Sequence, residues 1–177
     1  MLERYRKEIL PALQKQFGHR NAMAAARLQK IVLNIGCGEA AHDAKILEAV
    51  QQSLSLIAGQ RPLVTRAKKA ISNFKIKESD PVGCKVTLRR ARMYEFLDRL
   101  ISASLPRIRD FRGLNPNGFD QGGNYSFGLQ ELTLFPEVAS DQLPASMGMD
   151  IVVVTTASSR DEAFALLKGF GFPFAAK

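Results

Sequence analysis

Apolar residues recur at intervals of three and four positions in four stretches of the chain, which predicts four amphipathic helices. These stretches are residues 2–17, 46–57, 93–101 and 163–170. Gly18 should end the first helix, and Asp43 can cap the second. The third helix should finish before Pro106, because the residue ahead of a proline is disfavoured in helical geometry. Ser159 and Glu162 have the spacing of a capping box at the start of the last helix.

Alternation of apolar and polar residues predicts strands between these helices. The clearest strand is 82–89, where Val82, Cys84, Val86 and Leu88 alternate with Gly83, Lys85, Thr87 and Arg89. Residues 30–35 alternate in the same way, with Ile31, Leu33 and Ile35 on the apolar side. Further strands are expected at 62–66, 125–135 and 150–156.

Several predicted strands follow one another without an intervening helix, which is typical of α+β proteins. We therefore expect a mainly antiparallel sheet of about five strands, with helices packed on one face and the other face free for a partner. A chain of 177 residues is long enough for one sizeable core, so we expect a single domain covering residues 1–177. The free face would carry Lys30, Asn34, Lys85, Thr87 and Arg89.

The net charge of +8 is concentrated in one segment of the chain. Between Arg61 and Arg92 there are ten basic residues and only two acidic ones, so this segment accounts for the whole surplus. A localised surplus is typical of proteins that bind polyanions, because cations near phosphates release counterions on binding. The segment favours a nucleic-acid partner; an anionic membrane surface or an acidic protein is the alternative.

One aromatic residue stands among the cations of this basic segment. Residues 65–77 place Phe74 between lysines, where its ring can stack on an RNA base. The alternative is that Phe74, Ile71 and Ile76 cover the edge of the sheet while the lysines stay solvated. The sequence leaves both interpretations open.

A long loop is expected from residue 106 to residue 124, and three arginines stand near its start. Loops of this length inside a compact domain are usually functional or disordered. Arg107, Arg109 and Arg112 suit contact with phosphate or ribose. Pairing with Asp110 and with nearby backbone groups is the competing interpretation.

A glycine-rich turn offers the strongest resemblance to an enzyme motif. Gly36-Cys37-Gly38-Glu39-Ala40-Ala41 matches G-x-G-x-x-A and lies between a predicted strand and a predicted helix. A dinucleotide site would also need an acidic residue after the second strand, where residues 62–69 offer only cations. Tight turn geometry is therefore the preferred interpretation.

The remaining reactive side chains form no recognisable catalytic or metal-binding pattern. Cys37 and Cys84 make no CxxC pair and suit small buried thiols, and His19 and His42 have no motif partner. We expect no catalytic residue, no metal and no cofactor. The longest apolar runs are far shorter than a membrane span, so we expect a cytoplasmic protein without a membrane partner.

Several long motifs in fixed order carry a resemblance to a known family. They are Arg61-Pro62, Thr65-Arg66-Ala67-Lys68-Lys69, Gly83-Cys84-Lys85-Val86-Thr87-Leu88-Arg89, Met93-Tyr94-Glu95-Phe96-Leu97-Asp98-Arg99-Leu100, Pro106-Arg107-Ile108-Arg109-Asp110-Phe111-Arg112-Gly113-Leu114, Gly123-Asn124-Tyr125-Ser126, Phe135-Pro136-Glu137 and Gly171-Phe172-Pro173-Phe174. With these motifs the chain closely resembles the bacterial form of large-subunit ribosomal protein L5 over essentially its whole length.

The resemblance implies a non-enzymatic protein of the central protuberance of the large ribosomal subunit. Its implied partners are 5S rRNA, 23S rRNA, P-site tRNA, other 5S-binding ribosomal proteins and a small-subunit protein at an intersubunit bridge. The RNA-facing polar residues of the family fall on Asn34, Gln60 and Thr87. Two of these three positions lie on the sheet face expected from the alternation.

Three sets of candidate site residues follow. The rRNA-binding set is Lys30, Asn34, Gln60, Arg61, Arg66, Lys68, Lys69, Lys85, Thr87 and Arg89. The tRNA-binding set, in the loop of residues 70–81, is Ser72, Asn73, Phe74, Lys75 and Lys77. The set expected at the intersubunit bridge is Arg109, Arg112, Asn115 and Asn117.

The chain departs from the family pattern at two places. Arg90 stands where a glycine is commoner, which adds charge beside the expected RNA face. Gln121-Gly122 replaces a usual glycine and arginine, which removes a cation from the bridge loop. The alternatives that remain are an enzyme that uses the glycine-rich turn and a basic module for proteins or membrane surfaces.

Overall fold

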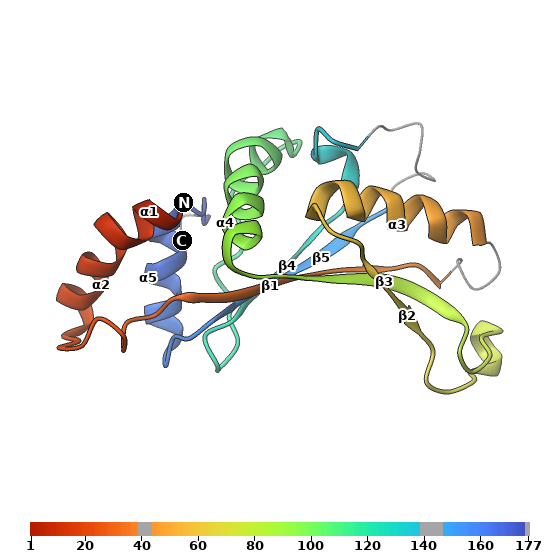
Figure 1. Cartoon of the computed structure of the whole chain (residues 1–177), viewed down its shortest axis with the longest axis horizontal. Coiled ribbons are helices and arrows are strands. Elements are labelled where there is room, and N and C mark those ends of the chain that lie inside the picture. Colours follow the sequence, from red (N-terminus) through yellow and green to blue (C-terminus); the bar gives the residue numbers. More distant parts are fainter. Residues whose placement is uncertain (39–43, 139–146, 176–177) are drawn as a thin grey trace. The chain divides into compact units, whose positions relative to one another are not determined.

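A computed structural model describes residues 1–38, 44–138 and 147–175 of the chain. Five strands pair in the order β2-β3-β1-β5-β4 and form an antiparallel sheet (Figure 1). Their bounds are β1 Leu28–Gly36, β2 Leu63–Arg66, β3 Pro81–Leu88, β4 Tyr125–Leu129 and β5 Met149–Thr155. The predicted α+β class and the number of strands are confirmed.

All four predicted helices are present. The first is a continuous segment made of α1 (Leu2–Arg4), the π-helical turn η1 (Tyr5–Ile9) and α2 (Leu10–Phe17). It ends where Gly18 adopts a left-handed conformation with φ of 70°. The others are α3 (Ala44–Ala58), α4 (Arg90–Arg99) with the π-helical turn η4 (Leu100–Ser104), and α5 (Arg160–Phe170). The expected cap Asp43 lies outside the described residues.

The strand predicted for residues 125–135 is wrong over its second half. Strand β4 ends at Leu129, and the 3-10 turn η6 (Leu132–Leu134) follows. In this turn the Phe135 N–H donates to the Leu132 carbonyl at 3.1 Å, and both side chains are buried. Residues three apart share one side of a 3-10 turn, whereas a strand would place them on opposite faces.

The third helical segment extends past the proline that was expected to stop it. The 3-10 turn η5 (Leu105–Arg107) follows η4 and contains Pro106 near its start. At the first positions of a helical turn the missing N–H of proline costs no intrahelical hydrogen bond. Turn η4 therefore ends before Pro106, as predicted. The helical segment as a whole extends one short turn further, through η5.

Half of the predicted capping box is present at the start of α5. The Ser159 hydroxyl accepts from the Glu162 N–H at 3.3 Å, as expected. The Glu162 carboxylate, however, accepts from the N–H groups of Ser158 at 3.1 Å and Ala26 at 3.0 Å, and it contacts His19 Nε2 at 2.9 Å. Glu162 is only 2% exposed, so this carboxylate joins the segment before β1 to the start of α5.

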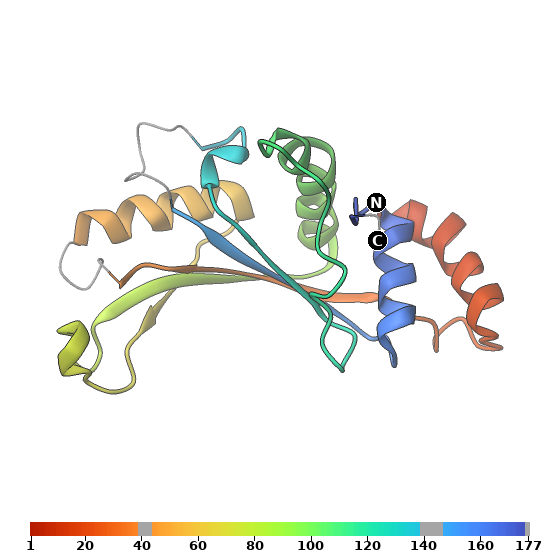
Figure 2. The same ribbon diagram turned by 180° about the vertical axis from the view of Figure 1, so that it is seen from behind.

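The described chain divides into two compact units. Unit 1 comprises residues 1–31, 88–127 and 151–177, and unit 2 comprises residues 32–87 and 128–150. In unit 1, Tyr5 stacks on Phe170 at 6.0 Å between ring centroids and donates its hydroxyl to the Ala26 carbonyl at 3.0 Å. Helix α5 thus packs against the first helical segment, as both ribbon views show (Figures 1 and 2). That residues 1–177 act as one domain stays a prediction.

In unit 2, helix α3 covers one side of the strands (Figures 1 and 2). Val50, Leu54 and Ile57 on α3 are fully buried, as is Cys84 on β3. Lys85 is exposed and Thr87 is half-buried, so alternate residues of β3 face away from the helix. The alternation predicted for this strand is confirmed.

Gly83 stands where β3 comes closest to its neighbours. A Cβ atom at this position would lie 2.4 Å from the Ile35 carbonyl oxygen and 3.2 Å from the Thr65 hydroxyl oxygen. We expect Gly83→Ala to lower the free energy of unfolding by roughly 1–3 kcal/mol, because β1 and β3 must separate locally to admit a methyl group. Urea denaturation measures this loss. Gly38→Ala is the control, since its Cβ would meet nothing within 4 Å; an equal loss in both variants would contradict the steric explanation.

Candidate nucleic-acid interface

Strands β2 and β3 form an antiparallel hairpin that carries half of the predicted rRNA-binding residues. Leu63 pairs with Lys85, and Thr65 pairs with Gly83. Residues paired across a sheet point to the same face. The face that carries Lys85 and Thr87 therefore also carries Leu63, which is 63% exposed.

The tip of this hairpin, residues 67–80, is held together by its own hydrogen bonds. Ala67 N–H donates to the Asp80 carbonyl at 2.8 Å, and Lys77 N–H donates to the Asp80 carboxylate at 2.7 Å. Arg66 Nη1 donates to the Ser79 carbonyl at 2.9 Å. Near the end, Ile71 and Ile76 form an antiparallel bridge around the 3-10 turn η3 (Ser72–Phe74). These bonds give the tip a defined shape.

The side chains of the hairpin tip point away from the protein. Phe74 is 69% exposed and Ile71 is 46% exposed, whereas Ile76 is half-buried. The interpretation in which Phe74 covers the sheet edge is therefore wrong. The remaining exposed candidates in this region are Arg61, just before β2, and Arg66, Lys68, Lys69, Ser72, Asn73, Lys75 and Lys77 on the hairpin.

The three polar residues implied by the family resemblance differ in their surroundings within unit 2. Asn34 on β1 is half-buried and lies on the side opposite to the fully buried Leu33 and Ile35. Gln60 donates from Nε2 to the Thr87 carbonyl at 3.1 Å, so it also fastens the end of α3 to β3. That these residues face RNA stays a prediction.

The loop predicted at the intersubunit bridge belongs to unit 1. Among the described residues, Asp110 forms no ion pair with Arg107, Arg109 or Arg112, so the competing interpretation is not supported as far as it rests on Asp110. Arg107, Arg109 and Arg112 are all exposed. Asn117 accepts from Arg160 Nη2 at 2.9 Å and thereby connects the loop to the start of α5.

Asn115 supports the same loop from within. Its side-chain oxygen accepts from the Asn117 N–H at 2.9 Å, and its carbonyl accepts from the Tyr125 hydroxyl at 2.9 Å. Burial raises the pKa of Tyr125 to about 12, so this hydroxyl remains a donor at neutral pH. Asn115 and Asn117 thus shape the loop, and Arg109 and Arg112 remain available for a partner.

The remaining reactive groups in the described structure suit packing rather than chemistry. Cys37 and Cys84 are buried free thiols, and burial together with the neighbouring Cys37 raises the pKa of Cys84. Within the described residues, no group of three or more metal-ligating side chains comes together, and no helix is long and apolar enough to cross a membrane. In the glycine-rich turn, Glu39, Ala40 and Ala41 lie outside the described residues, as does His42.

The backbone at position 90 has a conformation that suits glycine better than arginine. Arg90 has φ of 53°, in the left-handed region that favours glycine. An arginine at this position carries a backbone cost that a glycine would not.

The sequence matches two family models that together span most of the chain. One describes ribosomal protein L5 and matches residues 21–77; the other describes the C-terminal part of the same ribosomal family and matches residues 81–174. The second model alone covers more than half of the chain. The chain belongs to the ribosomal protein L5 family. It is therefore a structural, non-enzymatic constituent of the large ribosomal subunit in the cytoplasm.

Individual L5 proteins match nearly the full length of the chain. The large ribosomal subunit protein uL5 of Symbiobacterium thermophilum is 55% identical over 97% of this chain and 96% of its own length. The uL5 proteins of Caldanaerobacter subterraneus and Thermosipho africanus are 54% and 56% identical, over 98% and 97% of this chain and 97% and 95% of their own lengths. The resemblance inferred from the motifs is confirmed, and ribosomal RNA follows as a partner.

Proposed function

We propose that this L5-family chain binds 5S rRNA through the β2–β3 hairpin and the sheet face of Lys85 and Thr87. The exposed cations of the rRNA-binding set carry the proposal, since Lys68, Lys69 and Lys85 of the hairpin are all open to solvent. Exposed cations gain when they approach phosphates, because binding of the RNA releases counterions.

The proposed contacts divide by chemistry. The basic residues of the rRNA-binding set hold phosphates: Lys30, Arg61, Arg66, Lys68, Lys69, Lys85 and Arg89. The neutral polar residues Asn34, Gln60 and Thr87 bind ribose hydroxyls and base edges. Of these, Gln60 also donates from Nε2 to the Thr87 carbonyl at 3.1 Å, which holds its side chain beside Thr87.

Further contacts of the same protein are proposed at separate elements. The hairpin tip, with Ser72, Asn73, Phe74, Lys75 and Lys77, contacts P-site tRNA. Arg109 and Arg112, on the loop shaped by Asn115 and Asn117, contact a small-subunit protein at an intersubunit bridge. Contacts with 23S rRNA and with other 5S-binding ribosomal proteins complete the proposed set of partners.

Binding to 5S rRNA is tested with the full chain and two RNAs of equal length, the organism's own 5S rRNA and an unrelated structured RNA. We expect preference for 5S rRNA, with an affinity that falls steeply as the KCl concentration rises from about 50 to 200 mM. Filter binding across the salt series measures both quantities. If both RNAs bound equally and weakly, the basic segment would attract RNA only through non-specific charge, which would contradict the proposal.

A further inference from the structure

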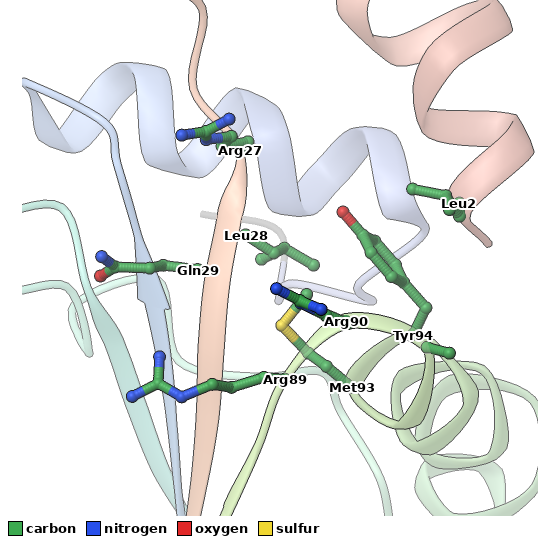
Figure 3. A pocket seen from close by; sticks show the side chains of 9 residues that line it. Leu2, Arg27, Leu28, Gln29, Arg89, Arg90, Met93 and Tyr94 are labelled. Carbon is green, nitrogen blue, oxygen red and sulfur yellow. The ribbon is translucent and has the colours of Figure 1, made fainter.

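A pocket of about 580 Å³ opens on unit 1 beside the start of α4 (Figure 3). Its floor is apolar and includes Leu28 and the buried Met93. Three arginines line it from three places in the sequence: Arg27 precedes β1, Arg89 follows β3, and Arg90 begins α4. Folding thus collects three positive charges around one opening.

Within the described part of the chain, no acidic side chain forms an ion pair with these arginines. The pocket lining contains no acidic residue. Among the described residues, the guanidinium groups of Arg27, Arg89 and Arg90 form no ion pair or side-chain hydrogen bond. All three residues are exposed, so their donors are available to a ligand. Arginines close together repel one another unless an anion lies between them.

Tyr94 lies within reach of the charge of Arg27. Burial raises the pKa of the Tyr94 hydroxyl, while the charges of Arg6 and Arg27 act in the opposite direction. Tyr94 is half-buried at the edge of the pocket, and Figure 3 shows its ring beside Arg90. The pocket therefore combines positive charge with an aromatic hydroxyl that can donate to a phosphate oxygen.

The backbone at Arg90 argues against an incidental surface arginine. With φ of 53°, this residue holds a conformation that a side chain disfavours and that glycine would adopt without strain. The strained backbone directs a guanidinium into the pocket next to Leu28 (Figure 3). Strained backbone conformations cluster at binding sites, so the conformation of Arg90 is consistent with a binding role.

We propose that the pocket of Arg27, Arg89 and Arg90 is a binding site for backbone phosphates of 5S rRNA. This inference rests on the proposed function and adds to it a contact made by unit 1. Arg89 follows Thr87 of the hairpin strand by two residues, so an RNA bound at Thr87 lies within reach of the pocket. Guanidinium groups suit this ligand because they bind phosphate oxygens in pairs.

The test compares the full-length wild type with Arg27→Gln/Arg90→Gln. We expect the double variant to bind 5S rRNA roughly tenfold more weakly at 150 mM KCl. The slope of log affinity against log KCl concentration should become shallower by about one to two. The matched control is Lys15→Gln/Arg20→Gln, which removes two exposed cations of the same unit and should change neither quantity. Hydroxyl-radical footprinting should show that one patch of the RNA backbone is protected by the wild type and by the control variant. Arg27→Gln/Arg90→Gln should not protect this patch.

A second variant separates binding from folding. Arg90→Gly relieves the left-handed strain, so its thermal unfolding midpoint should stay equal to that of the wild type or rise, while its affinity for 5S rRNA falls. If the wild type binds 5S rRNA specifically but Arg27→Gln/Arg90→Gln keeps its affinity, salt slope and footprint, the pocket is not a phosphate site. If the wild type shows no preference for 5S rRNA, the proposed function itself fails, and the inference fails with it.

Discussion

Asn34→Asp combined with Thr87→Asp should lower the affinity for 5S rRNA roughly 100-fold, equivalent to about 3 kcal/mol. Both side chains are half-buried, and in β1 and β3 they alternate with fully buried residues. Carboxylates at these positions would stand beside phosphates and repel them, and the lost amide and hydroxyl would no longer donate to ribose oxygens. Titration of labelled 5S rRNA at physiological salt measures the change.

The control must add the same charge elsewhere. Gln16→Glu/Gln52→Glu introduces two carboxylates at exposed positions of α2 and α3 and should leave 5S rRNA binding within about twofold of the wild type. Circular dichroism would check that each double variant remains folded. If Asn34→Asp/Thr87→Asp bound as tightly as its control, the RNA would have to lie on a different part of the protein.

The second large effect is expected from Glu162→Ala, which should lower the free energy of unfolding by roughly 3–5 kcal/mol. The substitution leaves the N–H groups of Ala26 and Ser158 without their acceptor. It also removes the partner of His19, which contacts the Glu162 carboxylate at 2.9 Å. Chemical denaturation measures the loss. The exposed Glu95→Ala in α4 is the control and should change stability by less than about 0.5 kcal/mol.

The same carboxylate predicts a dependence of stability on pH. Burial alone raises the pKa of Glu162, but hydrogen bonds from Ser158, His19 and Ala26 outweigh it, so the pKa lies below its ordinary value of 4.5. A carboxyl group whose pKa is lower in the folded than in the unfolded protein stabilises the fold. This contribution is fully present above about pH 4.5 and is lost as the pH falls through the pKa of the folded state. The stability of the wild type should therefore decline below pH 4.5 more steeply than that of Glu162→Gln. Parallel profiles for the two proteins would contradict this role.

Local patterns were sufficient to predict most secondary structure. The helical face of residues 2–17 and the alternation of residues 82–89 each correspond to an element in the structure. These predictions succeeded because one face of each element is buried and the other is exposed, so burial follows the backbone period. The errors fell where the pattern was ambiguous, as at residues 130–135, where a 3-10 turn buries Leu132 and Phe135 together.

The partner was also predictable from the sequence. The basic surplus between Arg61 and Arg92 is a property of composition, and the L5 motifs are properties of order along the chain. Neither depends on knowing which residues meet in space. The conclusion that the chain is a ribosomal protein therefore needed no structure.

Tertiary structure alone decided how distant residues are grouped. The sequence gives no signal that Arg27 lines a pocket with Arg89 and Arg90, or that His19 meets Glu162 143 positions away. It also could not decide that Phe74 is exposed, because a phenylalanine fits a sheet edge and a hairpin tip equally well. Local periodicity reports which face of an element is buried, whereas the residues that meet across elements depend on strand order and packing, which no local pattern encodes.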